Sequence, residues 1–290
     1  MWPLKMITKL LLARTPLPRS VLRQWGVFRH GDMDSLSYAA KVFDSHIARA
    51  YPQGTPAGLT FLELGPGDSL LSMVLAKGLG AEQIWLVDHG DFAARDLTLY
   101  QHSAQIWRAE GRGVPDLSKT DTWDDLLTQC RATYVTHGLE SLKKIPDSSV
   151  DFIYSHAVLE HIWRDDFAPL MREVRRILKP GGAASHVVDY QDHLDHALNH
   201  LRFPARVWES QAFRTSGFYT NRLLYQDMVA IFTESGFDTQ TTAHETWSSL
   251  PTPRRSLSAP YQTRSDAELK TKSATFILRP GAGIKKERAA

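Results

Sequence analysis

The sequence predicts an α/β protein with a doubly wound, mostly parallel, Rossmann-like sheet of about seven strands and helices on both faces. Short apolar runs alternate with helical patterns from residue 59 onward, which is typical of a parallel sheet. A Gly-Pro-Gly loop follows the first of these runs, where such sheets open their ligand crevice. With 42% hydrophobic and 23% charged residues in 290, the chain has an ordinary globular composition, which excludes a coiled coil and a disordered protein.

The first half of the chain supplies three strands. Residues 59–64 form an apolar run that glycines stop, and residues 83–88 and 133–136 are the next two strand-like runs. Helical patterns lie between these strands. One spans residues 69–77, after the first strand, and two span residues 92–100 and 122–130, after the second.

The second half contains the clearest strand and helix pair. Residues 150–155 read as a strand, and the following apolar residues fall at offsets 0, 3, 4, 7, 10 and 11 on one helix face: Phe167, Leu170, Met171, Val174, Ile177 and Leu178. Lys179-Pro180-Gly181-Gly182 is expected to end that helix. A fifth strand follows at 184–188, and a helix at 226–235 is closed by Gly236. The last two strands are expected at 237–244 and 273–278. We expect residues 283–290 to be a flexible tail.

Charge, cysteine content and hydropathy limit the expected partners and location of the protein. A net charge of +2 gives no general attraction for nucleic acid, so we expect no nucleic-acid partner. Cys130 is the single cysteine, which favours a reducing compartment and therefore the cytoplasm. No run approaches the roughly 18 apolar residues that cross a bilayer.

Residues 1–50 form a separate N-terminal basic helical segment in this interpretation. Its first 31 residues carry six lysines and arginines and no acidic residue: Lys5, Lys9, Arg14, Arg19, Arg23 and Arg29. Three interpretations stay open for this stretch. They are a solvated helix that leans on the domain, a peripheral membrane-contacting helix, and an organelle presequence.

The glycine loop is a candidate ligand site. Residues 63–69, with the sequence Glu-Leu-Gly-Pro-Gly-Asp-Ser, join a strand to a helix, where backbone N–H groups and glycines allow close approach of a ligand. The third glycine of a dinucleotide fingerprint is absent, because Leu70 stands in its place. NAD is therefore a lesser option than another nucleoside cofactor.

Four signatures in order resemble the class I S-adenosylmethionine-dependent methyltransferases. They are Leu-Glu-Leu-Gly-Pro-Gly at 62–67, Asp88 after the second strand, Pro-Asp-Ser-Ser-Val-Asp-Phe at 146–152, and Arg-Ile-Leu-Lys-Pro-Gly-Gly at 176–182. The resemblance implies a methyltransferase domain over residues 51–282, similar to those of bacterial sugar and small-molecule methyltransferases, with S-adenosyl-L-methionine as cofactor.

The same resemblance assigns cofactor contacts residue by residue. It places Glu63, Gly65 and Gly67 at the methionine moiety and Asp88 at the ribose hydroxyls. The resemblance places adenine at the segment after the third strand. This segment reads Gly138-Leu139-Glu140 where the family often has glycine-aspartate-alanine, so the backbone of Leu139 or the Glu140 side chain is expected to contact adenine. Four flanking residues complete the candidate set: Ser69, His89, Ser155 and His156.

Methyl transfer from a sulfonium needs alignment and benefits from a base. Candidate side chains follow the fourth and fifth strands, and they are His156, Glu160, His161, Asp189, Asp192 and His193. We expect His193 to be the base, with His161 as its rival and Asp189 as a further candidate. A hydrogen-bonded structural role is an equal alternative for His161.

Residues 189–221 are too long for a plain connection and are expected to form an inserted substrate lid. A helical pattern puts Leu194, Ala197, Leu198 and Leu201 on a buried face and places His193, His196 and His200 on a neighbouring stripe. Such a stripe could bind a metal, but no cysteine or carboxylate run completes it, so we expect no metal. Core packing is the better expectation for each of four aromatic residues taken alone, whereas as a group they offer flat surfaces to a small or medium organic acceptor. They are Trp208, Phe213, Phe218 and Tyr219.

The predicted function is methyl transfer from S-adenosylmethionine to a hydroxyl or amine of a small molecule or glycan. Ser155-His156-Ala157-Val158 stands where relatives that methylate nucleic-acid amines carry Asn/Asp-Pro-Pro-aromatic, which disfavours that substrate. A methyltransferase-like binding or assembly protein without turnover is the alternative, and an NAD-dependent oxidoreductase is third. The acceptor atom and the oligomeric state stay open.

Overall fold

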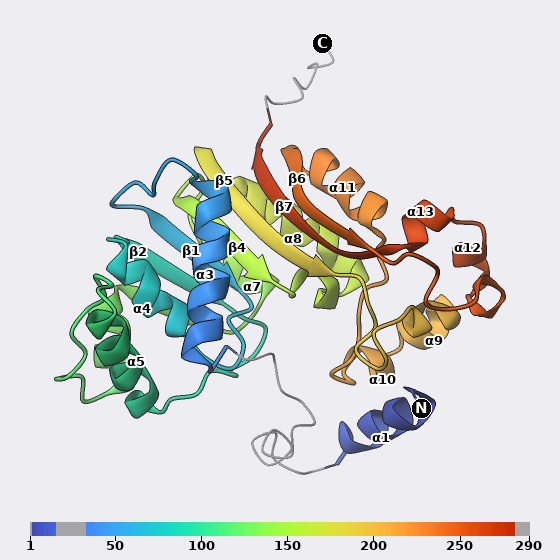
Figure 1. Ribbon diagram of the computed structural model, residues 1–290, viewed down its shortest axis with the longest axis horizontal. Helices are drawn as coiled ribbons and strands as arrows, with labels where there is room; N and C mark the ends of the chain where they lie inside the picture. Colours follow the sequence, from blue (N-terminus) through green and yellow to red (C-terminus); the bar gives the residue numbers. More distant parts are fainter. Residues whose placement is uncertain (1, 16–32, 282–290) are drawn as a thin grey trace.

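Seven strands form one sheet in the order β3-β2-β1-β4-β5-β7-β6 (Figure 1). The computed structural model describes residues 2–15 and 33–281. Strands β1 to β5 pair in parallel, and β7 runs antiparallel to both β5 and β6. The predicted fold class is confirmed. The strands are β1 (Thr60–Leu64), β2 (Gln83–Val87), β3 (Ala132–Val135), β4 (Val150–His156), β5 (Leu178–Asp189), β6 (Phe237–Thr246) and β7 (Thr271–Pro280).

Helices cover both faces of the sheet because neighbouring residues of a strand point to opposite sides. Phe61 of β1 joins the core beneath one layer, and Leu62 joins the core on the other side. The first layer contains α3 (Leu36–Ala50), α4 (Leu71–Gly78), α5 (Leu97–Ala109) and α6 (Trp123–Cys130). The second contains α7 (Leu139–Leu142), α8 (Arg164–Ile177) and α11 (Tyr225–Glu234).

Short helices gather beyond the ends of β5 and β7, and Figure 1 shows α1 lying beside α9 and α10. These elements are α1 (Trp2–Leu12), the 3-10 turns η1 (Leu159–His161), η2 (Asn199–Arg202) and η3 (Arg254–Ser256), and the helices α9 (Ala205–Trp208), α10 (Gln211–Arg214), α12 (Ala259–Gln262) and α13 (Asp266–Leu269). In the described part of the chain, no helix combines the length and the apolar character that a membrane span requires.

Two boundaries differ from the sequence prediction. The helix expected at 92–100 is α5, which begins only at Leu97 because the Asp96 side chain accepts the Thr98 N–H and caps it. Residues 179–182, expected to form the turn after a helix, belong to β5 instead. The helix α8 ends at Ile177, β5 starts at Leu178, and the pairing of β5 with β4 shifts register within these residues. The tail at 283–290 lies outside the described residues, as do Arg19, Arg23 and Arg29.

The helix predicted around residues 193–201 is wrong. The Asp192 carboxylate accepts N–H groups from four following residues (Leu194, Asp195, Ala197 and Asn199), which folds the chain into turns. Local bonds from a side chain to the backbone compete with a helix in this way. The three histidines therefore form no stripe: His193 is half-buried, His196 exposed and His200 buried.

The aromatic residues at 208–219 form a small core. Trp208, Phe218 and Tyr219 are buried with Leu194, and the Trp208 indole donates to the Thr220 carbonyl at 2.7 Å. Core packing, the expectation for each residue alone, is confirmed for these three. The expectation that they offer flat surfaces as a group is wrong for them, because the cluster buries their apolar area. From outside, α1 packs against this cluster with one face: Trp2, Met6 and Leu10.

Candidate active site

The glycine loop after β1 has a backbone that only glycine adopts readily. Gly65 and Gly67 both have φ of +67°, in the left-handed region. A Cβ at Gly65 would lie 2.6 and 2.8 Å from the two Val158 methyl carbons. Val158 follows β4, so the loop lies directly against the β4 end, and the predicted glycine positions are structurally required.

Asp88 ties the end of β2 to this loop. One carboxylate oxygen accepts the Gly67 N–H at 3.0 Å, and the other accepts the His89 N–H at 2.7 Å. The His89 ring projects outward, with Nδ1 3.3 Å from the Asp88 carboxylate. Loop and carboxylate, predicted from separate strands, are thus in direct contact.

Glu63 and Ser69 are buried at the two ends of the loop. The Glu63 carboxylate accepts the Ser72 hydroxyl, and burial raises the pKa of Glu63 to about 7 despite that bond. The Ser69 hydroxyl donates to the Met33 carbonyl and so holds the segment that leads into α3. A cation beside Glu63 would favour its ionised form.

The segment after β3 lies next to Asp88. The Gly138 N–H donates to the Asp88 carbonyl at 2.8 Å, and α7 begins at Leu139. Glu140 is exposed and pairs with Lys143 at 2.6 Å. The backbone of this segment is therefore held beside Asp88, while the Glu140 carboxylate is engaged at the surface.

The two residues at the end of β4 point to opposite faces of the sheet. The Ser155 hydroxyl is buried and shares a hydrogen bond of 2.8 Å with Nδ1 of His186 on β5. His156 Nδ1 lies 3.3 Å from Nε2 of His46, whose other ring nitrogen lies 2.7 Å from the Ser185 hydroxyl. Burial lowers the pKa of His156 to about 4, so its ring is neutral.

Sequence reasoning did not single out His46. Its signal is the periodicity of α3, where the buried residues fall on one face: Ala39, Ala40, Val42, Phe43, His46 and Ala50. A polar residue on such a face requires a partner, and here α3 supplies His46 to the strand ends.

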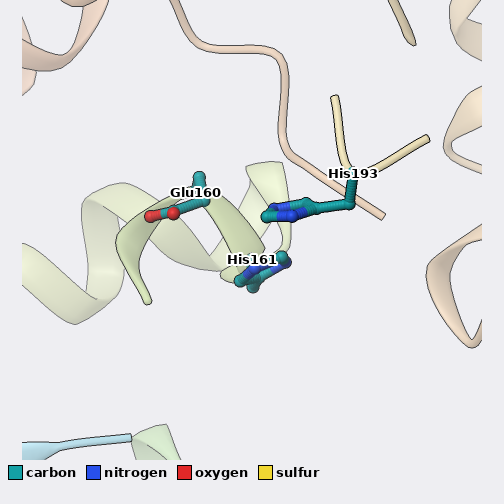
Figure 2. A group of neighbouring side chains, drawn as sticks. All are labelled: Glu160, His161 and His193. Atoms are coloured by element: carbon teal, nitrogen blue, oxygen red, sulfur yellow. The ribbon is translucent and has the colours of Figure 1, made fainter. Parts of the chain in front are cut away.

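Glu160, His161 and His193 lie together where the segments that follow β4 and β5 meet (Figure 2). One nitrogen or oxygen atom from each lies within 4.8 Å of those of the other two, and the two imidazole rings stack with centroids 4.8 Å apart. Glu160 and His161 come from η1 after β4, and His193 from the turns after β5. The two predicted rivals for the base are neighbours.

The hydrogen-bond partners fix the state of each imidazole. The Tyr219 carbonyl, which can only accept, lies 2.7 Å from Nδ1 of His161, so Nδ1 carries the proton and Nε2 the lone pair. Burial, and to a lesser degree the charge of Lys9, lowers the pKa of His193 to about 4. The His193 ring is therefore neutral and can accept a proton or a cation.

Two buried atoms of this group have no hydrogen-bond partner among the described residues. They are Oε2 of Glu160 and Nε2 of His193. The other Glu160 oxygen accepts the Asp189 N–H at 3.2 Å, and burial raises the pKa of Glu160 well above its usual range. Each unsatisfied buried group costs about 1–3 kcal/mol.

The third catalytic candidate, Asp189, lies at the end of β5. One of its carboxylate oxygens accepts both the backbone and the side-chain N–H groups of Gln191, at 2.9 and 3.0 Å. Its backbone N–H, not its carboxylate, contacts the Glu160 carboxylate. Asp189 thus orders the chain that leads to His193.

Helix α1 adds residues to this side that the sequence pattern could not place. Lys5 Nζ donates to the Leu194 carbonyl at 3.3 Å, and the Arg202 guanidinium lies 5.4 Å from the centre of the Trp2 ring. Lys9 influences the His193 ring. Such contacts join residues about 190 positions apart, for which local sequence carries no signal.

A comparison with family models finds one match across the first five strands. Residues 62–185 match the family model described as "Methyltransferase domain". No curated protein matches the chain. The matched residues span β1 to most of β5 and include the glycine loop, Asp88, Glu160 and His161.

Three solved structures illustrate the structural similarity. The YcgJ protein from Bacillus subtilis is 18% identical over 83% of this chain and 98% of its own, with a TM-score of 0.47. CrArsM, an arsenic(III) S-adenosylmethionine methyltransferase from Chlamydomonas reinhardtii, is 22% identical over 79% and 67%, with a TM-score of 0.47. Phosphoethanolamine N-methyltransferase 2 from Haemonchus contortus is 16% identical over 83% and 52%, with a TM-score of 0.46. The chain spans about half the length of this last protein, and none of these similarities identifies an acceptor.

Proposed function

Through residues 62–185 the chain belongs to the class I S-adenosylmethionine-dependent methyltransferases, and we propose that it methylates a hydroxyl or amine of a small molecule or glycan. S-adenosylmethionine is the methyl donor. The observation that carries the proposal is the pair of stacked imidazoles, His161 and His193, at the carboxyl ends of β4 and β5. Parallel sheets bind their ligands at that edge, and oxygen and nitrogen acceptors must lose a proton.

We propose that the loop of Gly65 and Gly67 receives the methionine moiety and that Asp88 accepts the ribose hydroxyls. The buried carboxylate of Asp88 and its contact with the loop support this placement. Glu63, at the start of the loop, stabilises the positive charge of the donor. The backbone around Leu139 and Glu140 meets adenine, and Ser69, His89, Ser155 and His156 border the cofactor.

In the proposed reaction the acceptor oxygen or nitrogen attacks the methyl carbon as the carbon–sulfur bond breaks. The bonding electrons stay on sulfur, which yields S-adenosylhomocysteine, and the acceptor's proton passes to an imidazole nitrogen. We assign this role to Nε2 of His193, with Nε2 of His161 as the rival position and Asp189 as an ordering carboxylate. With a pKa of about 4, His193 accepts the proton late, as the bond to carbon forms.

Methyl-labelled S-adenosylmethionine tests the proposal directly. The full-length protein is incubated with panels of phenols, sugars, nucleotide sugars and amines, and label in each product is counted. We expect transfer to at least one hydroxyl or amine class. Binding of the cofactor with transfer to none of them would instead favour the alternative, a methyltransferase-like binding protein without turnover.

We further propose that α1 makes peripheral contact with anionic lipid. Leu4, Ile7 and Leu11, spaced by three and four residues, expose 49–66% of their surface on the side of α1 away from the aromatic cluster. The first 31 residues carry no acidic side chain. An exposed apolar face in a basic segment is typical of helices that lie in the membrane interface. A cytoplasmic location fits the single cysteine, Cys130.

Replacing Leu4, Ile7 and Leu11 together by glutamate is expected to weaken binding to anionic vesicles more than tenfold, because three apolar side chains no longer enter the interface. Vesicle co-sedimentation measures this. Leu79→Glu, at an exposed leucine outside α1, is the matched control and should bind like the unaltered protein. Equal loss in the control, or no vesicle binding by the unaltered protein, would contradict the proposal.

Deleting residues 1–15 should leave S-adenosylmethionine affinity unchanged.

A further inference from the structure

We propose that Glu160, His161 and His193 form a binding site for a divalent transition-metal cation of the zinc class. The inference deepens the proposed function and rests on it for the location beside the acceptor. The sequence pattern had pointed to a different histidine set and to no metal, because the Glu160 group is assembled only when the ends of β4 and β5 come together.

The donor set is the first argument. Two imidazoles and one carboxylate, each with one ligand atom within 4.8 Å of the others, are the ligands of many catalytic zinc sites. Zinc bonds of about 2.0–2.1 Å place tetrahedral ligands roughly 3.4 Å apart, so the side chains would draw together by roughly 1 Å. Figure 2 shows all three side chains on neighbouring segments, with the two rings side by side.

The surrounding hydrogen bonds orient these ligands. A metal-binding histidine usually donates its second ring N–H to a carbonyl or carboxylate. His161 does so toward the Tyr219 carbonyl at 2.7 Å, which directs the lone pair of Nε2 away from that bond. In the same way the Asp189 N–H holds one Glu160 oxygen and leaves the other for a cation.

Two unsatisfied atoms are the second, independent argument. Glu160 is only 2% exposed, and its Oε2 has no protein hydrogen bond within residues 2–15 and 33–281. Nε2 of His193 is also buried and also has no hydrogen-bond partner in the described part of the chain. No hydrogen bond joins these two atoms, so a shared proton does not account for both. A cation between them would satisfy both at once.

The imidazoles select the class of cation. Magnesium and calcium prefer oxygen ligands throughout, whereas imidazole suits zinc, cobalt, nickel and iron. With three protein ligands, a position stays open for an acceptor oxygen, whose pKa the cation would lower. With the cation bound, Nε2 of His193 is a ligand and takes no proton, and the acceptor oxygen, made more acidic by the cation, loses its proton to solvent. Nε2 of His193 acts as the proton acceptor only in the cation-free protein. Lys9, whose charge reaches His193, opposes the cation and provides a further test.

The test uses full-length, tag-free protein, treated with a chelator and titrated with Zn²⁺ by calorimetry and with Co²⁺ by visible absorption. We expect one saturable site and the intense absorption of tetrahedral Co²⁺. Glu160→Gln and His193→Ala should each weaken binding tenfold to hundredfold. His196→Asn is the matched control, because His196 is exposed on the same segment and asparagine tolerates its φ of 52°. Lys9→Gln should tighten binding.

Thermal unfolding supplies a readout that does not depend on activity. Zinc should raise the melting temperature of the unaltered protein and of His196→Asn but not of Glu160→Gln, since only a ligand that binds the folded state stabilises it. No saturable site, or equal weakening in His196→Asn, would overturn the cation site. S-adenosylmethionine titration of the same samples separates the two proposals, because failure there would remove the proposed function whatever the cation result.

Discussion

His193→Ala is expected to lower methyl-transfer turnover by roughly a hundredfold or more and to leave S-adenosylmethionine affinity nearly unchanged. This is the usual size of effect for removing a positioned proton acceptor. The ring of His193 stacks on that of His161, whereas the Asp88 carboxylate is bonded to the N–H groups of Gly67 and His89, so the affinity for the cofactor should not respond. Turnover is measured with the acceptor found in the labelled-methyl screen, beside a calorimetric titration of the cofactor.

The same assay applied to His161→Ala decides between the two imidazoles. Full activity in His193→Ala with a large loss in His161→Ala would transfer the role of base to His161. Full activity in both variants would mean that alignment of donor and acceptor alone carries the reaction. His196→Asn, on the same segment as His193, should retain full turnover.

Asp88→Ala is expected to weaken S-adenosylmethionine binding on the order of a hundredfold. Losing one charge-assisted hydrogen bond costs on the order of 1.5–3 kcal/mol, or roughly tenfold to hundredfold in affinity. The substitution also removes the acceptor for the Gly67 and His89 N–H groups, so the loop loses its anchor.

Asp91→Ala is the matched control for this prediction. Asp91 lies three residues further along and forms a surface pair with Arg95 at 2.7 Å, with its side chain half exposed. Its removal should change cofactor affinity little, because exposed pairs contribute little. Equal affinity in Asp88→Ala and the unaltered protein, or equal loss in both variants, would refute the role of Asp88.

The sheet and the glycine loop were predictable because their signals are local. Gly65 and Gly67 are needed where the backbone has positive φ, and the apolar strands on either side of them alternate with helices in the order that a parallel sheet requires. The helical face of α8, from Phe167 to Ile177, follows from spacing alone. In each case short-range pattern and long-range packing favour the same structure.

The acceptor side was predictable only in part, since His161 and His193 were expected near strand ends but their contact was not. The Asp192 carboxylate accepts N–H groups of the residues that follow it, and these bonds form turns where the apolar pattern had indicated a helix. Trp208 packs into a small local core. The cover that α1 provides and the buried His46 depend on contacts between distant segments. No periodicity within one segment encodes such contacts.

A calorimetric titration of the full-length protein with S-adenosylmethionine, run beside one with NAD, tests the central claim most directly. The glycine loop held by Asp88, with Leu70 in place of a third glycine, predicts saturable binding of one S-adenosylmethionine per chain and none of NAD. No heat of binding for S-adenosylmethionine, or tighter binding of NAD, would contradict the assignment.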